Sequence, residues 1–350
     1  METISFARGV PAPECLAEEE LADCARAVIG REGRSILSYG PAAGYTPLRE
    51  LIAQWFGVHP YRVLLTNGSL QALGLLAQRF VQGQNVIVEY PTYDRALKVL
   101  LAAGGSLLAA VVDDDGMNIE DLEIQLVGQM KPAFVYTIPT FQNPTGRTLP
   151  EERRRRMVEV LGPRNILIVE DDPYSLIRFE GEALPAIFDY ADKNSIYMGS
   201  FSKAIAPGLR VGWLIVPEEL AGELTEVAAS NYITPSLISQ AIVHEFIARG
   251  SFEPNLRRMN ELLKARRDAM LAALEKHFSG ATWTRPEGGY FIWLQVPLGQ
   301  NMGEVLERAE GVTAMLGSEF SAASNCLRLA YSFASPDEIE IGIERLAAAM

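Results

Sequence analysis

Short apolar segments alternate with helical patterns through the middle of this chain, and this alternation most constrains its fold. Six runs carry a strand pattern rich in Val, Ile and Tyr: RVLLT, NVIVEYP, PAFVYTIPT, NILIVEDDPY, SIYMGS and VGWLIVP. Helix-length segments such as SLQALGLLAQRFVQ and EERRRRMVEVLG lie between several of them. Hydrophobic strands that alternate with helices predict a mainly parallel sheet covered on both faces. Functional groups of such sheets lie at the carboxyl ends of the strands.

The pattern changes after about residue 220. Two long helical segments, SLISQAIVHEFIARG and EPNLRRMNELLKARRDAMLAALEKHF, are followed by the strand-like runs GGYFIWLQVP and CLRLAYSF. A last helix is predicted at SPDEIEIGIERLAAAM, whose first residues form a helix-capping sequence. We expect a smaller α+β domain at this end of the chain.

Charge and cysteine content exclude several classes of protein. The 350 residues carry a formal net charge of −13, which argues against a nucleic-acid partner because phosphate binding needs a basic surface. No apolar run is long enough for a membrane span, and METISFARG lacks the apolar core of a secretory signal. Three scattered cysteines and three histidines indicate neither a disulfide framework nor a metal site. We expect a cytoplasmic protein that binds small molecules.

The segment GSFSKAIAPGLRVGW contains the first candidate site. Lys203 follows an apolar strand, with hydroxyls at Ser200 and Ser202 and a guanidinium at Arg210. Hydroxyls and an arginine fork suit a phosphate monoester, and a lysine beside such an anchor suggests an aldehyde cofactor bound as a Schiff base. The simpler interpretation of Lys203 alone is a surface lysine in a loop.

The segment VEDDPYSL ends another predicted strand. Alternation along the strand places Asp171 on the face opposite Glu170 and Asp172. A buried carboxylate there could keep the ring nitrogen of pyridoxal phosphate protonated, and Tyr174 could donate to the phenolic oxygen of that ring. A capped turn or a metal-binding acid pair are the alternatives, although further metal ligands are lacking.

Three more strand ends carry polar or aromatic groups. Asn143, in PTFQNPTG, is a candidate donor to the same phenolic oxygen, and its bond to the following proline is a candidate for the cis form. The turn before SLQALGLL offers the backbone N–H groups of Gly68, Ser69 and Leu70 to an anion. Tyr93, in EYPTYDRAL, could stack on a pyridine ring, although core packing is the commoner role for an aromatic residue there.

Arg328 stands within the otherwise apolar strand NCLRLAYSF. A charge inside a buried strand is costly unless it is paired. It either has an internal acid partner or binds the carboxylate of a ligand, and we favour the second interpretation because amino acids and 2-oxo acids share that group.

Taken together, these motifs resemble the class I/II aminotransferases of pyridoxal-phosphate fold type I. The segments YGPAAGYTPLRE, TNGSLQAL, PTY, PTFQNPTG, VEDDPY, GSFSKAIAPGLRVGW, RPEGGYFIWL and LRLAYSF occur in the order typical of that family. The likeness is greatest to the branch that contains 2-aminoadipate aminotransferases and the effector domains of MocR-type regulators, and it covers nearly the whole chain.

The resemblance implies a fold and a domain organisation. The large domain, residues 44–248, is expected to hold a mainly parallel seven-stranded sheet covered by helices and to bind pyridoxal phosphate. The small α+β domain is expected to comprise residues 249–350 together with the N-terminal segment 1–43, which also contributes dimer contacts.

The resemblance also implies roles for individual residues. Lys203 is expected to form the Schiff base and to act as acid and base, with Asp171 as the partner of the pyridinium and Tyr93 as the stacking aromatic. Arg328 resembles the anchor of the α-carboxylate. The other expected cofactor contacts are Asn143 and Tyr174 at the phenolic oxygen, and Gly68, Ser69, Leu70, Ser200, Ser202 and Arg210 at the phosphate.

The resemblance includes one further shared feature and three departures. Tyr39 resembles the tyrosine that reaches the phosphate of the neighbouring subunit, which implies a homodimer with shared active sites. Relatives usually carry about thirty residues before the segment that corresponds to ISFARG, and many show glutamine where this chain has Leu70. Arg8 replaces a glycine common in relatives. Arg8 and Gly9 are expected beside the substrate, where Arg8 could meet an acidic side chain, and a surface arginine is the alternative interpretation of Arg8.

The expected activity is transfer of an amino group between an L-amino acid and a 2-oxo acid, with 2-oxoglutarate as the favoured acceptor and ping-pong kinetics. Another pyridoxal-phosphate reaction, such as β-elimination or decarboxylation, is the first alternative. A ligand-sensing effector domain is the second, and an α/β binding protein without pyridoxal phosphate is the third.

Overall fold

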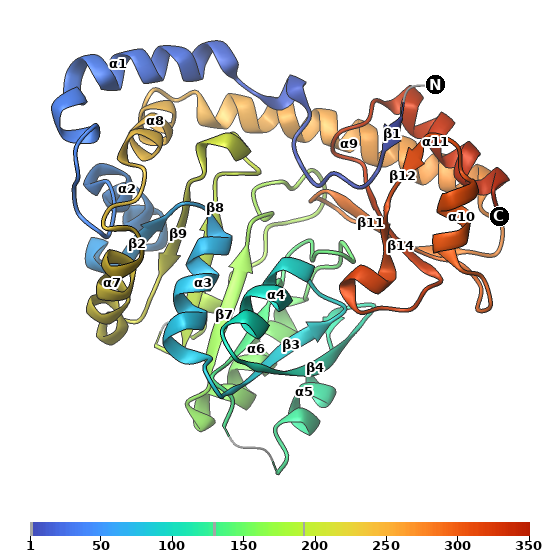
Figure 1. Cartoon of the computed structure of the whole chain (residues 1–350), viewed down its shortest axis with the longest axis horizontal. Helices are drawn as coiled ribbons and strands as arrows, with labels where there is room; N and C mark the ends of the chain where they lie inside the picture. The colour runs from blue at the N-terminus through green and yellow to red at the C-terminus, as the bar shows by residue number, and fades with distance from the viewer. Residues whose placement is uncertain (1–2, 129–130, 192) are drawn as a thin grey trace.

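A mixed sheet of eight strands forms the centre of the larger part of the molecule in the computed structural model, which describes residues 3–128, 131–191 and 193–350 (Figure 1). Its strand order is β2-β9-β8-β7-β6-β3-β4-β5. The bounds are β2 Val63–Thr66, β3 Asn85–Tyr90, β4 Ser106–Asp113, β5 Gly116–Met117, β6 Phe134–Thr137, β7 Leu167–Asp172, β8 Ser195–Ser200 and β9 Gly212–Ile215.

The sheet is mainly parallel, as expected. Strands β8, β7, β6, β3 and β4 run parallel, whereas β9 is antiparallel to both β8 and β2. The two-residue strand β5 is antiparallel to β4 and extends the expected seven strands by one at the edge. The predicted fold class is confirmed.

Helices cover both faces of this sheet, so its central strands are hydrophobic on both sides. In β3, Val86 and Val88 pack in the cluster under α3, α4 and α7, and Ile87 packs in the cluster under α5 and α6. All residues of β6, β8 and β9 are buried. The helix bounds are α3 Ser69–Phe80, α4 Asp94–Ala102, α5 Ile119–Gln125, α6 Glu151–Leu161 and α7 Glu218–Tyr232.

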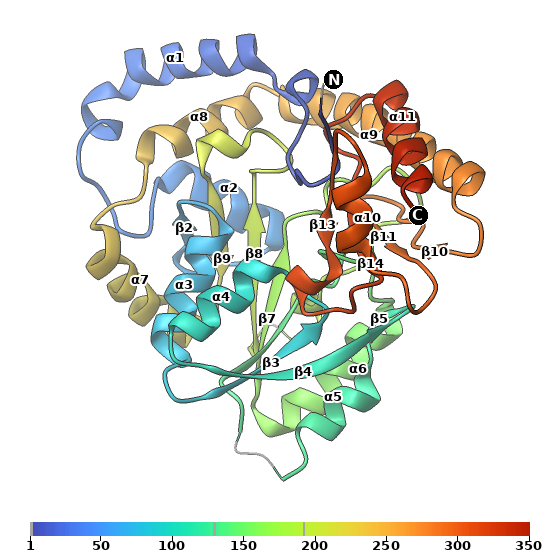
Figure 2. The ribbon, with the colours of Figure 1, turned by 45° about the vertical axis from the view of Figure 1, so that its right-hand side comes forward.

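A second sheet, with four antiparallel strands, forms the smaller part of the molecule. Its order is β10-β11-β14-β13, with bounds β10 Thr282–Trp283, β11 Phe291–Gln295, β13 Met315–Leu316 and β14 Cys326–Ala330. The N-terminal strand β1, Ile4–Ser5, pairs in parallel with β12, Val312–Thr313, so the start of the chain lies beside its last part (Figure 2). The boundaries 1–43, 44–248 and 249–350 stay predictions.

Long helices cover one side of the molecule (Figure 1). Helix α9 extends over 26 residues, about 39 Å at 1.5 Å per residue, and packs against α11. The expected cap of α11 is present, because the Glu338 carboxylate accepts a bond from Ser335 N at 2.7 Å. The bounds are α1 Glu18–Ile36, α2 Thr46–Phe56, α8 Leu237–Ala248, α9 Phe252–His277, α10 Met302–Arg308 and α11 Pro336–Ala348.

The parallel strands β3, β6, β7 and β8 end at the same edge of the large sheet. The segments that follow them, and the N-terminal end of α3, therefore meet between the two parts of the molecule. Within the described ranges, no helix has the length and apolar character needed to cross a membrane.

Candidate active site

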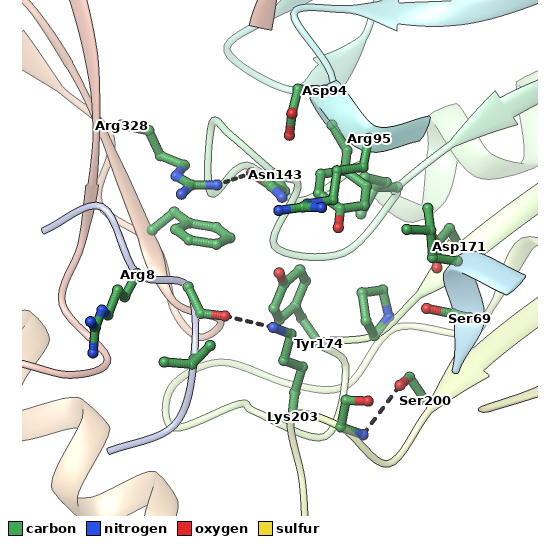
Figure 3. A pocket seen from close by; sticks show the side chains of 18 of the residues that line it. Arg8, Ser69, Asp94, Arg95, Asn143, Asp171, Tyr174, Ser200, Lys203 and Arg328 are labelled. Atoms are coloured by element: carbon green, nitrogen blue, oxygen red, sulfur yellow. Dashed lines mark hydrogen bonds between the residues drawn. The ribbon is translucent and has the colours of Figure 1, made fainter. Parts of the chain in front are cut away.

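A cavity of about 500 Å³ lies at this edge of the sheet, between the two parts of the molecule (Figure 3). Its walls come from the ends of the parallel strands, from the N-terminal segment, and from β11, β13 and β14. The lining residues include all of the predicted site residues except Gly68 and Tyr39: Arg8, Gly9, Ser69, Leu70, Tyr93, Asn143, Asp171, Tyr174, Ser200, Ser202, Lys203, Arg210 and Arg328.

Lys203 projects into the cavity from the loop after β8. Its Nζ donates to the backbone oxygen of Gly9 at 2.6 Å. Burial, together with the positive charges of Arg328 and Arg210, lowers the pKa of Lys203 to about 8. A substantial fraction of this amine is therefore neutral near physiological pH, which is the form that attacks a carbonyl and accepts a proton.

Asp171 faces the cavity from the end of β7. Its Oδ2 accepts a bond from the Tyr136 hydroxyl at 2.7 Å, whereas its buried Oδ1 has no partner among the described residues. Burial raises the pKa of Asp171 to about 7, and the bond from Tyr136 opposes that rise. A buried carboxylate oxygen without a donor is costly, so this site fits a ligand that brings one N–H.

The neighbours of Asp171 serve other parts of the fold, as strand alternation predicts. Glu170 accepts bonds from the backbone N–H groups of Ile187 and Phe188 at 3.0 and 2.9 Å. Asp172 accepts from the Tyr197 hydroxyl at 2.8 Å. Within the described ranges, no group of three acidic, histidine or cysteine side chains could hold a metal ion.

The N-terminal end of α3 and the loop after β8 together form an anion cradle. Arg210 Nη1 donates to Ser202 Oγ at 3.4 Å, and its Nη2 donates to Asn67 O at 3.1 Å. Gly68 lies against this guanidinium, because a Cβ on Gly68 would be 2.2 Å from Arg210 Nη2, and its φ is +92°. Glycine therefore keeps the arginine close to the helix end, where backbone N–H groups and Ser69 favour an anion.

Arg328 extends from β14 into the opposite end of the cavity and is 6% exposed. Its Nη1 donates to Asn143 Oδ1 at 2.9 Å, and its Nη2 donates to Ala7 O at 2.7 Å. No described carboxylate pairs with it, and its Nε lacks a partner. Of the two interpretations open from the sequence, binding of an external carboxylate agrees with this arrangement.

Two of the predicted residues lie differently from the rest. Gly68 does not line the cavity but supports Arg210 from behind. Tyr39 is 81% exposed and is not among the residues that line this cavity. The guanidinium of Arg8 lies 5.4 Å from the ring centroid of Phe333, at the margin of the cavity.

Sequence reasoning missed two residues of the site. In the sequence, Tyr136 stands within an apolar strand pattern, but a buried tyrosine hydroxyl usually needs a hydrogen-bond partner. Arg95, two residues after Tyr93, extends beside Asn143 (Figure 3). Both could have been found from the rule that functional groups lie at the carboxyl ends of parallel strands. Tyr136 lies in β6, which ends at this edge, and Arg95 lies in the segment after β3.

Comparison with known proteins agrees with this geometry. Residues 6–346 match the family model of aminotransferase class I and II. The chain belongs to this family. It is 35% identical to a 2-aminoadipate transaminase of Thermus thermophilus over 358 aligned residues, which cover 99% of this chain and 90% of that protein. It is also 35% identical to aromatic-amino-acid aminotransferase 1 of Thermococcus litoralis, with 99% and 87% covered.

Solved structures give the same result. The crystal structure of the α-aminoadipate aminotransferase LysN from Thermus thermophilus, in complex with N-(5'-phosphopyridoxyl)-L-leucine, superposes with a TM-score of 0.94 and covers 99% of this chain and 92% of that one. Helix-turn-helix regulators match as well: YdfD of Bacillus subtilis is 32% identical, with 88% of this chain and 66% of that protein covered.

The protein is therefore a pyridoxal-phosphate-dependent transaminase, and the residues of the cavity fit that cofactor. The cavity is lined by three kinds of group: an amine suited to an aldehyde, an anion cradle, and a buried carboxylate oxygen without a partner. These are the groups that the aldehyde, the phosphate and the ring nitrogen of pyridoxal phosphate require.

The bond from Tyr136 to Asp171 generates a prediction. In Tyr136→Phe, the pKa of Asp171 should rise further because the carboxylate loses a donor, so less of it is charged at neutral pH. A hydrogen bond to a charged group contributes about 1.5–3 kcal/mol, so we expect the dissociation constant of pyridoxal phosphate to increase about tenfold or more. Titration of the apoprotein with the cofactor at neutral and alkaline pH checks this. The defect should shrink at alkaline pH, and an equal defect at both pH values would contradict the explanation.

Proposed function

We propose that this chain transfers the amino group of an L-amino acid to 2-oxoglutarate by ping-pong kinetics, as a homodimer. The observation that carries the proposal is the pairing of two groups across one cavity. Lys203 offers an amine with a lowered pKa at one end, and Arg328 offers a buried guanidinium without a carboxylate partner at the other. This arrangement suits a substrate in which an α-carboxylate lies next to the reacting carbon.

The cofactor, when bound, supplies an electron sink for the bonds at the substrate α-carbon. Asp171 Oδ1 is the acceptor that would hold a proton on the ring nitrogen, and the Tyr93 side chain would stack on the ring. Asn143 and Tyr174 would donate to the phenolic oxygen. The phosphate would be held by Ser69, Leu70, Ser200, Ser202 and Arg210, with Gly68 behind them.

Lys203 Nζ would move protons during turnover. Its neutral amine is the group that would take a proton from the α-carbon of the substrate and later return one. The positive charges of Arg328 and Arg210 act in the same direction as burial and keep the pKa of this amine low. The bond from Lys203 to Gly9 O brings the N-terminal segment over the reacting region.

The choice of 2-oxoglutarate rests on the arginines of the cavity that have no role in the assignments above. Its second carboxylate needs a further guanidinium, and Arg95 and Arg8 both line the cavity. Arg8 lies by the Phe333 ring, whereas no ion pair or hydrogen bond engages Arg95 within the described residues. The adjacent acid, Asp94, is paired with Lys98 at 2.8 Å. We therefore assign the second carboxylate to Arg95.

A substrate panel tests the activity. With a series of L-amino acids and 2-oxoglutarate, we expect glutamate to form from at least one donor, and Lys203→Ala to lose both this activity and the visible absorption of the bound cofactor. If a donor instead releases its 2-oxo acid and ammonia without any acceptor, elimination is the reaction. If no donor reacts with loaded enzyme, the effector-domain alternative, which the matched regulators favour, replaces this proposal.

A second test addresses Arg95. In Arg95→Met, the KM for 2-oxoglutarate should rise about tenfold, because a charge-assisted bond to the second carboxylate is lost, while the KM for pyruvate should stay the same. Arg8→Met is the matched control and should change neither value. Equal effects of Arg95→Met on both acceptors would assign the second carboxylate elsewhere.

An exposed apolar patch supports the homodimer. Leu37, Tyr39 and Ile233 are 63%, 81% and 61% exposed, and the bond from Gly40 N to Thr234 Oγ1 holds their two segments together. Ile233 has a φ of +61°, an unfavourable conformation for a β-branched residue. Exposed apolar side chains that gather in one place are typical of a surface that a partner covers.

The same patch is linked to the anion cradle. Ser236 N, three residues after Ile233, donates to Asn67 Oδ1 at 3.0 Å, and Asn67 O accepts from Arg210. Residues that cover the patch would therefore lie near the phosphate. This supports the assignment of Tyr39 to the phosphate of the other copy.

Ile233→Asp tests the patch. A charge in a buried apolar interface is costly, so we expect a monomer in size-exclusion chromatography with light scattering, and weaker binding of pyridoxal phosphate. Leu298→Asp is the control, because Leu298 is 88% exposed and lies outside this patch. It should leave the oligomeric state and the binding of pyridoxal phosphate unchanged. A dimer that persists in Ile233→Asp would place the interface on another surface.

A further inference from the structure

Glu89, at the end of β3, is a buried carboxylate that the proposed chemistry does not use. It is 3% exposed, and no positive charge faces it among the described residues. Four groups donate to it: Thr137 Oγ1 at 2.6 Å, Ile138 N at 3.2 Å, Gln142 Nε2 at 3.0 Å and Thr92 Oγ1 at 3.5 Å. Burial of an acid without a basic partner costs free energy. The role of Glu89 is therefore sought in the groups that donate hydrogen bonds to it.

Two of these donors come from two segments that each form a wall of the cavity. Thr92 directly precedes Tyr93, and Gln142 directly precedes Asn143. Gln142 Nε2 also donates to Pro91 O at 2.8 Å, so its side chain joins both segments.

The other end of Gln142 fixes the turn itself. Its Oε1 accepts bonds from Thr145 N at 2.9 Å and Thr145 Oγ1 at 2.7 Å. All hydrogen-bonding groups of this side chain are therefore used. Since the carboxylate of Glu89 accepts from the same amide, it holds the turn around Asn143 against the segment that carries Tyr93.

We propose that Glu89 is a positioning residue, which acts through Gln142 and Thr92 to set the places of Asn143 and Tyr93. Asn143 is 4% exposed, and its Oδ1 accepts from Arg328. Its amide N–H₂ is then the group left to face the ring oxygen of the cofactor. A shift of this turn would change the α-carboxylate site and the cofactor site together. This inference rests on the roles proposed above for Asn143 and Arg328.

Glu89→Gln tests the inference in the holoenzyme. Only one acceptor oxygen remains in this variant, so the new N–H₂ group faces either the amide of Gln142 or the backbone N–H of Ile138, donor against donor, and the turn loosens. A weaker bond from Asn143 to the ring oxygen should raise the pH midpoint of the visible absorbance change, which reports the proton on the Lys203 nitrogen, by about 1. Misplacement of Asn143 and Arg328 should raise the KM for every amino donor about tenfold, whatever its side chain. Arg328 and Arg210, the charges that act on Lys203, are unchanged in this variant.

Two further variants separate positioning from general destabilisation. Gln142→Met removes the amide that joins the two segments, at nearly constant volume, and should reproduce the shift of the pH midpoint. The double variant Glu89→Gln/Gln142→Met should shift the midpoint little further, because both substitutions act on the same hydrogen bond. Thr137→Val removes another donor to the same carboxylate, at 2.6 Å, but touches neither wall. It should lower the melting temperature and leave the midpoint and the KM values unchanged.

The outcomes are distinct. Equal midpoints in Glu89→Gln, Gln142→Met and the original protein would overturn the inference, even if all variants were less stable. If Glu89→Gln does not fold, the comparison of Gln142→Met with Thr137→Val decides in the same way. Because the midpoint is read from bound cofactor without substrate, loss of transamination with every donor would overturn the proposed function without removing this test.

Discussion

Hydrogen bonds to buried carboxylates at one edge of the large sheet are the interactions on which the rest of this structure depends. Glu89 is the next-to-last residue of β3, and Asp171 is the next-to-last residue of β7, two strands away in the sheet. Each is held by donors from other strands or loops, Asp171 by Tyr136 and Glu89 by Gln142 and Thr137. In a low-dielectric interior these bonds are strong, and a missing donor is costly. The chain is therefore committed to one arrangement of the loops that surround the cavity.

The site also requires that the two parts of the molecule meet in one way. Arg328 of the small part bonds to Asn143 of the large part and to Ala7 of the N-terminal segment. Lys203 bonds to Gly9 of that same segment. Both reactive ends of the cavity therefore touch residues 7–9, which β1 secures through its pairing with β12. A change at β12 can therefore reach Lys203 through this short strand.

Much of the fold and of the candidate site could be predicted from the sequence. Strand periodicity can be seen in short segments, and the topology of parallel sheets then determines which segments meet. Polar residues that follow apolar strands, such as Asp171 and Lys203, had to meet at one edge once the strands were parallel. The strand β5 is too short to show a period. The position of Arg8 depends on Phe333, hundreds of residues later, and no local pattern contains that contact. Glu89 is different: it is a charge in an apolar strand, and the argument applied to Arg328 would have found it.

The charge of the cavity opposes the charge of the chain, and this contrast bears on how substrates reach the site. The whole protein carries −13, yet Lys203, Arg210, Arg328, Arg95 and Arg8 outnumber the two acids that line the cavity, Asp94 and Asp171. Anionic substrates and a phosphate-bearing cofactor are repelled by the average surface and attracted by this one cleft. Exposed charges act over about 10 Å at moderate salt, so the attraction operates only near the mouth. Binding is thus directed to the place where buried carboxylates, a low-pKa amine and a guanidinium without a carboxylate partner already hold their positions.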